Sequence, residues 1–142
     1  MVSFVSKIIS NIQFPISKQI PILKFMKIYF GHSKDFDFKN ELYKPIRESV
    51  LNNEHEILFP HETDEFFNSK DRIKNCDLMI AEVSYPATGL GIELGWAEML
   101  KTQVLCVSRK GCKISGSLKV VTKDFIEYEN AEDLVEKLTK FI

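Results

Sequence analysis

The sequence predicts a single α/β domain in which helices cover both faces of a parallel β-sheet. The first observation is that β-rich and helix-patterned segments alternate from residue 27 to the C-terminus. The second is the run DLMIAEV at residues 77–83, whose nearly continuous apolar character is typical of a central parallel strand. The third is length, because 142 residues suit one ordinary domain.

The strands are predicted from short β-rich runs that end at glycine, proline or polar residues. The first run ends at Gly31 and the second is closed by Pro60. We expect the five strands at residues 27–30, 55–59, 77–83, 103–108 and 125–128.

The helices are predicted from apolar residues at helical spacing. Pro45 interrupts the first of them and marks a late helix start, and Phe66 and Ile73 are expected to face inward from the second. Asn130 caps the last helix, with Asp133 as the acid of a start that resembles a capping box. We expect the other helices at residues 38–52, 66–75 and 92–101.

This alternation implies right-handed crossovers, and five strands favour the flavodoxin-like, doubly wound order 2-1-3-4-5. In such sheets ligands bind beyond the C-terminal ends of the strands, at the switch point between strands 1 and 3. The segments that leave those strands, residues 31–33 and 84–91, both carry glycine and hydroxyl side chains. We therefore expect the functional site where residues 29–33 meet residues 84–93.

Composition excludes several classes of function. The formal net charge is −1 and the basic residues are scattered, which disfavours a nucleic acid polymer as partner. No apolar stretch is long enough for a membrane span. The three cysteines form no CxxC pair, which indicates a reducing, cytoplasmic setting.

The first 26 residues differ from the rest, because they contain three lysines and no acidic residue. Their short amphipathic pattern is stopped by Pro15 and Pro21, and it lacks the long apolar core of a signal peptide. Either this extension packs on the domain or touches a membrane surface, or Met26 is the natural start and the extension is dispensable. We favour the second interpretation and place the functional domain at residues 27–142.

Residues 86–97 carry the chemistry that the sequence suggests. Gly89 and Gly91 let a ligand approach backbone N–H groups at a helix N-terminus, and Thr88 is an N-cap or a hydroxyl donor to the ligand. The plainer alternative is that the glycines only let the helix lie close to the sheet. Glu93, expected in the first helical turn, is a candidate nucleophile or base, or else a solvated acid favoured by the helix dipole.

The segments KIYFGHS (27–33), RIKNCD (72–77) and AEVSYPATGLGIELGWA (81–97) together resemble the nucleoside 2-deoxyribosyltransferase family. Within it they most resemble the branch of 2'-deoxynucleoside 5'-phosphate N-hydrolases. The resemblance runs from Lys27 to about Ser117. It implies a nucleoside or nucleotide substrate, a homodimer or higher homo-oligomer, and neither a metal nor an organic cofactor.

The resemblance also implies roles for individual residues. Glu93 matches the nucleophile that attacks C1' of the deoxyribose, and Tyr29 matches a tyrosine that positions this carboxylate and the sugar. The residues that match or neighbour those holding the sugar or the 5'-phosphate are Gly31, Ser33, Gly89 and Ser117. His32 and Thr88, which lie in the same two loops, are also expected to bind the substrate. In the hydrolase branch the residue at the Ser117 position comes from the partner subunit.

Two positions depart from the family pattern. Where the family places a second carboxylate, this chain has Ser69. Asp71 is our candidate for that role, although it lies about 200° around the helix from Ser69, while Glu65 points more nearly the same way. Ala87 stands where the hydrolase branch has a serine. Without a good acid, purines would be the easier leaving groups, because N7 protonates readily.

Three functions compete. The first is cleavage or transfer at the N-glycosidic bond of a nucleoside or its 5'-monophosphate. The second is a nucleotide-binding or sensing domain that has lost catalysis, which Ser69 favours. The third, a receiver or flavodoxin, is disfavoured because strand 3 ends in Glu82-Val83-Ser84 and the first loop is poor in hydroxyls. His32 and His61 lack metal-binding spacing, so no metal site is expected.

Overall fold

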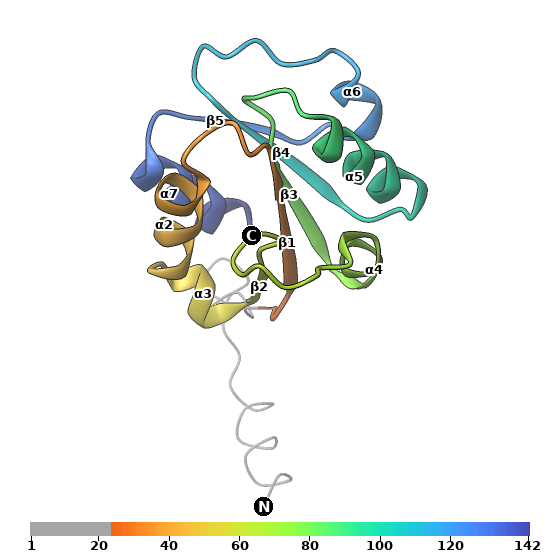
Figure 1. Cartoon of the computed structure of the whole chain (residues 1–142). Helices are drawn as coiled ribbons and strands as arrows, with labels where there is room; N and C mark the ends of the chain where they lie inside the picture. Colours follow the sequence, from red (N-terminus) through yellow and green to blue (C-terminus); the bar gives the residue numbers. More distant parts are fainter. Residues whose placement is uncertain (1–23) are drawn as a thin grey trace, which may run out of the picture.

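The computed structural model describes residues 24–142, which form a five-stranded, all-parallel sheet (Figure 1). The observed strand order, β2-β1-β3-β4-β5, confirms the predicted order. The predicted extension lies outside the described residues, apart from its last three. The strands are β1 (Lys27–His32), β2 (Glu56–Leu58), β3 (Leu78–Glu82), β4 (Val104–Arg109) and β5 (Phe125–Tyr128).

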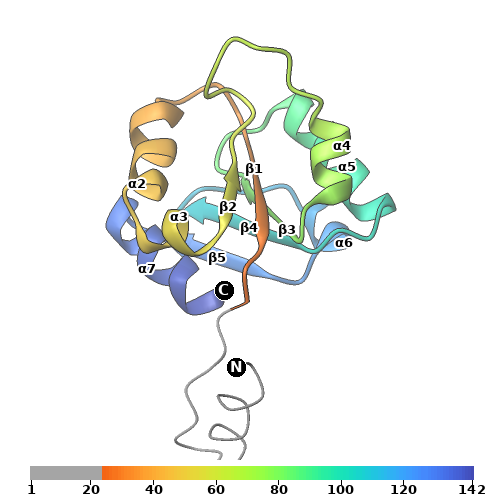
Figure 2. The same cartoon turned by 90° about the horizontal axis from the view of Figure 1, so that it is seen from below.

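Helices cover both faces of the sheet, with α2, α3 and α7 on one side and α4, α5 and α6 on the other (Figure 2). A π-helical turn, η2, runs directly into α2. The bounds are η2 (Lys39–Tyr43), α2 (Lys44–Arg47), α3 (Val50–Glu54), α4 (Ser69–Asn75), α5 (Thr88–Met99), α6 (Leu118–Val121) and α7 (Ala131–Phe141). Within residues 24–142, no helix is both long enough and apolar enough to cross a membrane.

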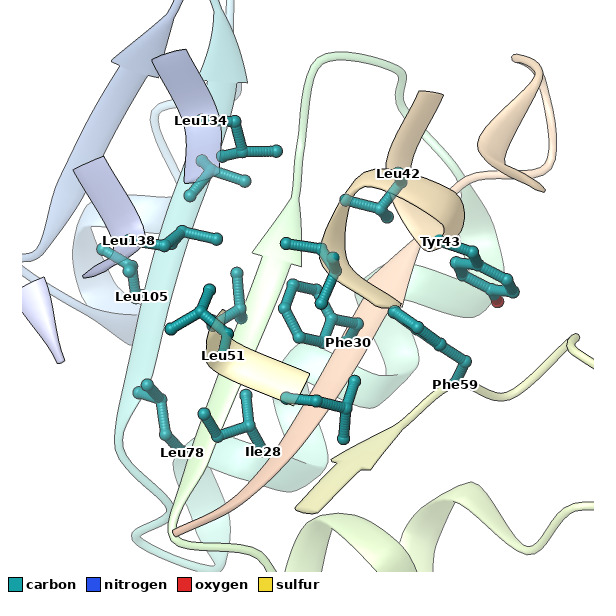
Figure 3. Packing of buried hydrophobic residues seen from close by; sticks show 14 of the residues in the cluster. Ile28, Phe30, Leu42, Tyr43, Leu51, Phe59, Leu78, Leu105, Leu134 and Leu138 are labelled. Atoms are coloured by element: carbon teal, nitrogen blue, oxygen red, sulfur yellow. The ribbon is translucent and has the colours of Figure 1, made fainter. Parts of the chain in front are cut away.

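Alternation along the strands divides the core into two clusters. Ile28 and Phe30 of β1 pack under α2, α3 and α7, together with Leu51 and Leu134 (Figure 3). Tyr29 points the other way, into the cluster beneath α4 and α5. Because successive side chains of a strand lie on opposite faces, β1 sends its buried tyrosine to the α5 face.

The predicted helix at 38–52 is wrong in its continuity. The backbone forms the π-helical turn and α2, breaks at Ser49, whose conformation is extended, and resumes as α3. Pro45 has no N–H to continue an α-helical ladder, and it lies in the first turn of α2, where that loss is tolerated.

Two further helix boundaries differ from the predictions. α4 begins at Ser69 because the Asn68 side chain caps it, so Phe66 lies outside the helix and is 92% exposed rather than inward-facing. α5 begins at Thr88 with Ala87 as its N-cap, which places Glu93 in the second turn and makes Thr88 the first helical residue. The short α6 was not predicted.

The start of α7 confirms the predicted cap. The Asn130 side chain accepts a hydrogen bond from the Asp133 N–H at 2.9 Å. The Asp133 carboxylate accepts from the N–H of Glu129, one residue before the position that a capping box would use.

Candidate active site

Tyr29 and Glu93 meet at the switch point between β1 and β3. The Tyr29 hydroxyl donates to Glu93 Oε2 at 2.9 Å and lies 3.2 Å from Ser69 Oγ. A phenol has one proton, so donation to the carboxylate leaves the Tyr29 oxygen to accept from Ser69. Three elements therefore converge on one carboxylate: β1 through Tyr29, α4 through Ser69 and α5 through Glu93.

The packing of α5 brings Glu93 to Tyr29. Leu90 and Leu94 of this helix are buried against the sheet, and Glu93 lies between them in the sequence. Gly31 supplies the room: a Cβ there would lie 2.7 Å from Met79 Cε, 3.0 Å from Leu90 Cδ1 and 3.1 Å from Glu93 Oε2. A side chain at residue 31 would thus crowd Met79, Leu90 and the carboxylate of Glu93.

The environment of Glu93 raises the pKa of its carboxyl above the usual value. Burial is the main cause, and the hydrogen bonds from Tyr29 and Ser69 act in the opposite direction because they stabilise the ionised form. Burial and the neighbouring Glu93 also raise the pKa of Tyr29, which remains a neutral donor. A half-desolvated carboxylate with one oxygen held by a neutral donor suits nucleophilic or base chemistry.

A cleft of about 450 Å³ opens over Glu93. Its walls come from the exit of β1, from the segment between β2 and α4, and from the start of α5. The lining residues are His32, Ser33, Lys34, Asp35, His61, Pro86, Ala87, Thr88, Gly89, Leu90 and Glu93. We call this hollow the Glu93 cleft.

A second hollow of about 400 Å³ adjoins the Glu93 cleft and shares Lys34 and His61 with it. Ser69 lines this second hollow, so the two spaces meet around the Tyr29–Glu93 pair. Its other lining residues are Phe38, Lys39, Pro60, Thr63, Asp64, Glu65 and Phe67. The combined space is polar near Asp64 and Glu65 and aromatic near Phe38 and Phe67.

Most of the residues predicted for the site lie together. Glu93 and Tyr29 are in contact, Gly31 packs against Glu93, and the remaining predicted ligand-binding residues of the two loops line the Glu93 cleft. These are His32, Ser33, Thr88 and Gly89.

His32 lies in the cleft wall with both ring nitrogens occupied. Its Nδ1 contacts the Ser33 carbonyl at 2.7 Å, and its Nε2 contacts the Tyr43 hydroxyl. Burial lowers the pKa of His32 to about 4, so the ring is neutral near pH 7. In this state Nδ1–H donates to Ser33 and Nε2 accepts from Tyr43, which also accepts from the His61 N–H. The ring is thus held as part of the wall.

Asp71 and Ser117 lie apart from the cleft. The carboxylate of Asp71 is exposed in the first turn of α4, where it accepts from the Asn68 side chain at 2.8 Å. It lines a different hollow, on the β2 side of the helix. Ser117 precedes α6 and lines an apolar hollow of about 310 Å³ behind the Pro86–Leu90 segment. Neither residue contacts Glu93 of its own chain.

Lys34 and His61 line both spaces around Glu93, a role that the sequence did not predict for them. His61 precedes the irregular segment that leads to α4, and its position depends on that segment's path. A histidine directly after a strand-ending proline was the available signal. Across residues 24–142, no group of three or more His, Cys, Asp or Glu residues is arranged to hold a metal ion.

Neither the models of protein families nor the curated proteins give a match to this sequence. Solved structures do match its fold. A CMP N-glycosidase, BcmB, of Clostridium botulinum aligns over 80% of this chain and 98% of its own, with a TM-score of 0.59 and 20% sequence identity. A 2-deoxyribosyltransferase of Bacillus psychrosaccharolyticus aligns over 76% and 89%, with a TM-score of 0.51 and 23% identity. The chain shares their fold.

A conserved protein from Enterococcus faecalis V583 has the same architecture. It aligns over 84% of this chain and all of its own length, with a TM-score of 0.55 and 16% identity. At these identities the likeness establishes the fold that the sequence predicted, and the chemistry has to be argued from the site itself.

Proposed function

We propose that this protein cleaves, or transfers at, the N-glycosidic bond of a (deoxy)nucleoside or its 5'-monophosphate, with Glu93 as the nucleophile. The observation that carries the proposal is the hydrogen bond from Tyr29 to Glu93 Oε2 at the base of the cleft between the β1 and β3 exits. The fold shared with an N-glycosidase and a 2-deoxyribosyltransferase supports it.

The geometry suits this reaction. Tyr29 holds Oε2, and among the described residues Oε1 has no hydrogen-bond partner, which leaves it to attack C1'. Breaking the bond to the base builds positive charge on C1', and the close carboxylate traps it as a glycosyl ester. Water then attacks C1' and completes hydrolysis, or a second base attacks and completes transfer.

The departing base requires a proton, and Ser69 is not acidic enough to provide one. Asp64, Glu65 and His61 line the hollow that Ser69 shares, whereas Asp71 lines neither space. We therefore move the proposed proton donor from Asp71 to the segment between β2 and α4.

The decisive experiment is chromatographic detection of free base after incubation with a panel of nucleosides and their 5'-monophosphates. Glu93→Gln keeps the shape of the side chain but removes the nucleophile, so we expect base release to fall by at least 10³-fold, on the order of 4 kcal/mol of transition-state stabilisation. Glu98→Gln is the matched control, because Glu98 is an exposed glutamate of the same helix. Base release by Glu93→Gln at a rate close to that of the wild type and of Glu98→Gln would contradict the proposal.

The alternative is a nucleotide-binding or sensing domain of the same fold, and Ser69 is the observation that favours it. Calorimetric titration with the same panel separates the two functions. Binding of a nucleotide without base release, in the wild type as well as in Glu93→Gln, would establish the binding domain.

We further propose that a second copy of the chain completes the site. Ser117 does not line its own Glu93 cleft, and the resemblance places such a serine in the partner's site. The outer faces of α5 and α6 expose Ile92, Met99 and Val120, an apolar surface of the kind that subunit interfaces cover.

A further inference from the structure

Glu82 is a buried acid that the proposed reaction does not use. It is the last residue of β3 and is only 1% exposed. Together with Leu78 and Ile80 it lies on the face of the sheet opposite Tyr29 and Glu93. Because burying a carboxyl group is costly, its retention at the centre of the sheet calls for compensating hydrogen bonds.

Ser84 provides those hydrogen bonds. Its backbone N–H donates to Glu82 Oε1 at 2.9 Å, and its hydroxyl donates to the same oxygen in a short hydrogen bond. The Ser84 oxygen in turn accepts from the backbone N–H of Arg109 at 2.8 Å. Glu82 and Ser84 thereby tie the chain leaving β3 to the end of β4.

The charged and titratable groups around Glu82 come from every neighbouring element. His32 of β1 is its partner in register, Arg109 belongs to β4, Glu41 to η2 and Tyr128 to β5. Arg109 Nη2 donates to Glu41 at 2.6 Å. Within the described residues Glu82 Oε2 and Arg109 Nε lack partners. Burial raises the pKa of Glu82, and Ser84 and Arg109 act against this shift.

The hydrogen-bonded Ser84 lies two residues before the part of the Glu93 cleft wall that the start of α5 provides. The chain passes from Ser84 through Tyr85, whose ring stacks on Phe36 with centroids 5.1 Å apart, into Pro86, Ala87, Thr88 and Gly89. Those four residues line the cleft and open the helix that carries Glu93. The hydrogen bonds of Ser84 therefore hold the chain two residues before Pro86, the first of these lining residues.

We propose that Glu82 is a positioning residue, which holds Ser84 so that the residues after it, Pro86 to Gly89, form their part of the wall of the Glu93 cleft. It acts through the backbone of that segment and does not touch the reacting atoms. Its effect on base release rests on the proposed function, but its effect on the segment does not.

The test pairs hydrogen exchange with kinetics in four variants. Glu82→Gln keeps an oxygen that accepts from Ser84, so we expect exchange across residues 84–93 and base release to stay within about threefold of wild type. Glu82→Leu keeps a side chain of similar volume but has no hydrogen-bond acceptor for Ser84. Ser84→Ala removes the hydroxyl that bonds to Glu82 and to the Arg109 N–H. In both variants we expect the amides of residues 84–93 to exchange at least tenfold faster than in the wild type, and kcat to fall about tenfold. We expect their thermal midpoints to fall less than the midpoint of the control variant Val107→Ala.

The control is Val107→Ala, a core truncation on β4 directly opposite Glu82 in register. It lowers stability without touching the hydrogen bonds of Ser84, so we expect exchange to rise across the sheet and not selectively at residues 84–93. If Glu82→Leu does not fold, Ser84→Ala decides. Unchanged exchange at residues 84–93 in Glu82→Leu and Ser84→Ala, or the same pattern there as in Val107→Ala, would overturn the proposal.

The two readouts keep this proposal separate from the proposed function. If the wild type releases no base from any substrate, the proposed function fails, while hydrogen exchange still tests the positioning role of Glu82. If the wild type is active and Glu82→Leu matches it in exchange and in kcat, the positioning role of Glu82 fails and the proposed function stands.

Discussion

At the scale of single residues, the hydroxyl of Tyr29 does more for the site than its ring. The ring is buried between the sheet and the helices, while the hydroxyl donates a hydrogen bond to Glu93 Oε2 and favours the ionised form of this carboxyl. A hydrogen bond to an ionised carboxylate lowers its pKa, opposing the upward shift from burial. The two effects of the side chain can therefore be separated by removing one oxygen atom.

Tyr29→Phe removes that oxygen and leaves the packing in place. We expect kcat to fall about 10- to 100-fold, on the order of 1–3 kcal/mol for a hydrogen bond to a charged group. In the proposed reaction Glu93 acts as the ionised form, and the variant loses a hydrogen bond that favours this form, so the acid limb of the pH–rate profile should move to higher pH. Tyr128→Phe, on the other face of the sheet, is the control. An acid limb that stays in place or moves to lower pH would contradict the role given to Tyr29.

Gly31 is the second residue whose role is local. In Gly31→Ala the new methyl group meets Met79, Leu90 and Glu93 at 3.1 Å or less, so the carboxylate has to move. We expect a loss of about 1–3 kcal/mol in the free energy of unfolding, as for an overpacked core, and at least a tenfold loss of base release.

Gly95→Ala is the matched control for this substitution, because nothing lies within 4 Å of a Cβ there and the position is helical. Alanine should stabilise it by about 0.5–1 kcal/mol. Urea denaturation measures both free energies. Equal stability changes of the same sign in the two variants would show that the space around Gly31 is not limiting.

At the scale of elements, local signals predicted the start of α7 but not the starts of α4 and α5. The cap by Asn130 is a contact between residues three apart, so the sequence contains it. The apolar spacing of Phe66 and Ile73 predicted a helix from residue 66, but α4 begins at Ser69, directly after the Asn68 cap. α5 begins at Thr88 after an Ala87 N-cap that makes no side-chain hydrogen bond, so its start has no capping signal in the sequence.

The α7 cap allows a test of stability without a test of the site. Asn130→Ala leaves the N–H of Asp133 without its acceptor, and we expect the free energy of unfolding to fall by about 0.5–2 kcal/mol. Because α7 lies on the face opposite α5, the kinetics of base release at 25 °C should stay unchanged. Thermal denaturation followed by circular dichroism measures the first effect. A changed KM would indicate that α7 is coupled to the cleft.

At the scale of the whole molecule, the sheet topology was the property most readily predicted from the sequence. The acid proposed to donate a proton to the departing base was the least predictable. Alternating segments allow few arrangements of a parallel sheet, and the switch point follows from the strand order. The Tyr29–Glu93 pair was therefore predictable once the strands were placed. The hollow beside Ser69 was not, because Asp64 and Glu65 lie on an irregular segment whose path is set by tertiary packing.

The position of Ser117 leads to a prediction about assembly. Within its own chain this serine faces an apolar hollow and not the Glu93 cleft, so a role in binding requires a second copy. In a dimer with two-fold symmetry each subunit would give Glu93 to one site and Ser117 to the other. Sites built this way can be repaired by mixing two different inactive subunits.

Glu93→Gln and Ser117→Ala chains, each purified and then dissociated and reassembled together, should recover activity. A mixed dimer has one site with both native residues and one with neither, so random pairing restores about a quarter of the wild-type sites. Light scattering confirms that dimers form, and mass spectrometry with one variant isotope-labelled detects the mixed dimers. Recovery toward this fraction would place Ser117 in the partner's cleft. Activity in the exchanged mixture no higher than the sum of the separate variants would confine each site to one chain and remove Ser117 from it.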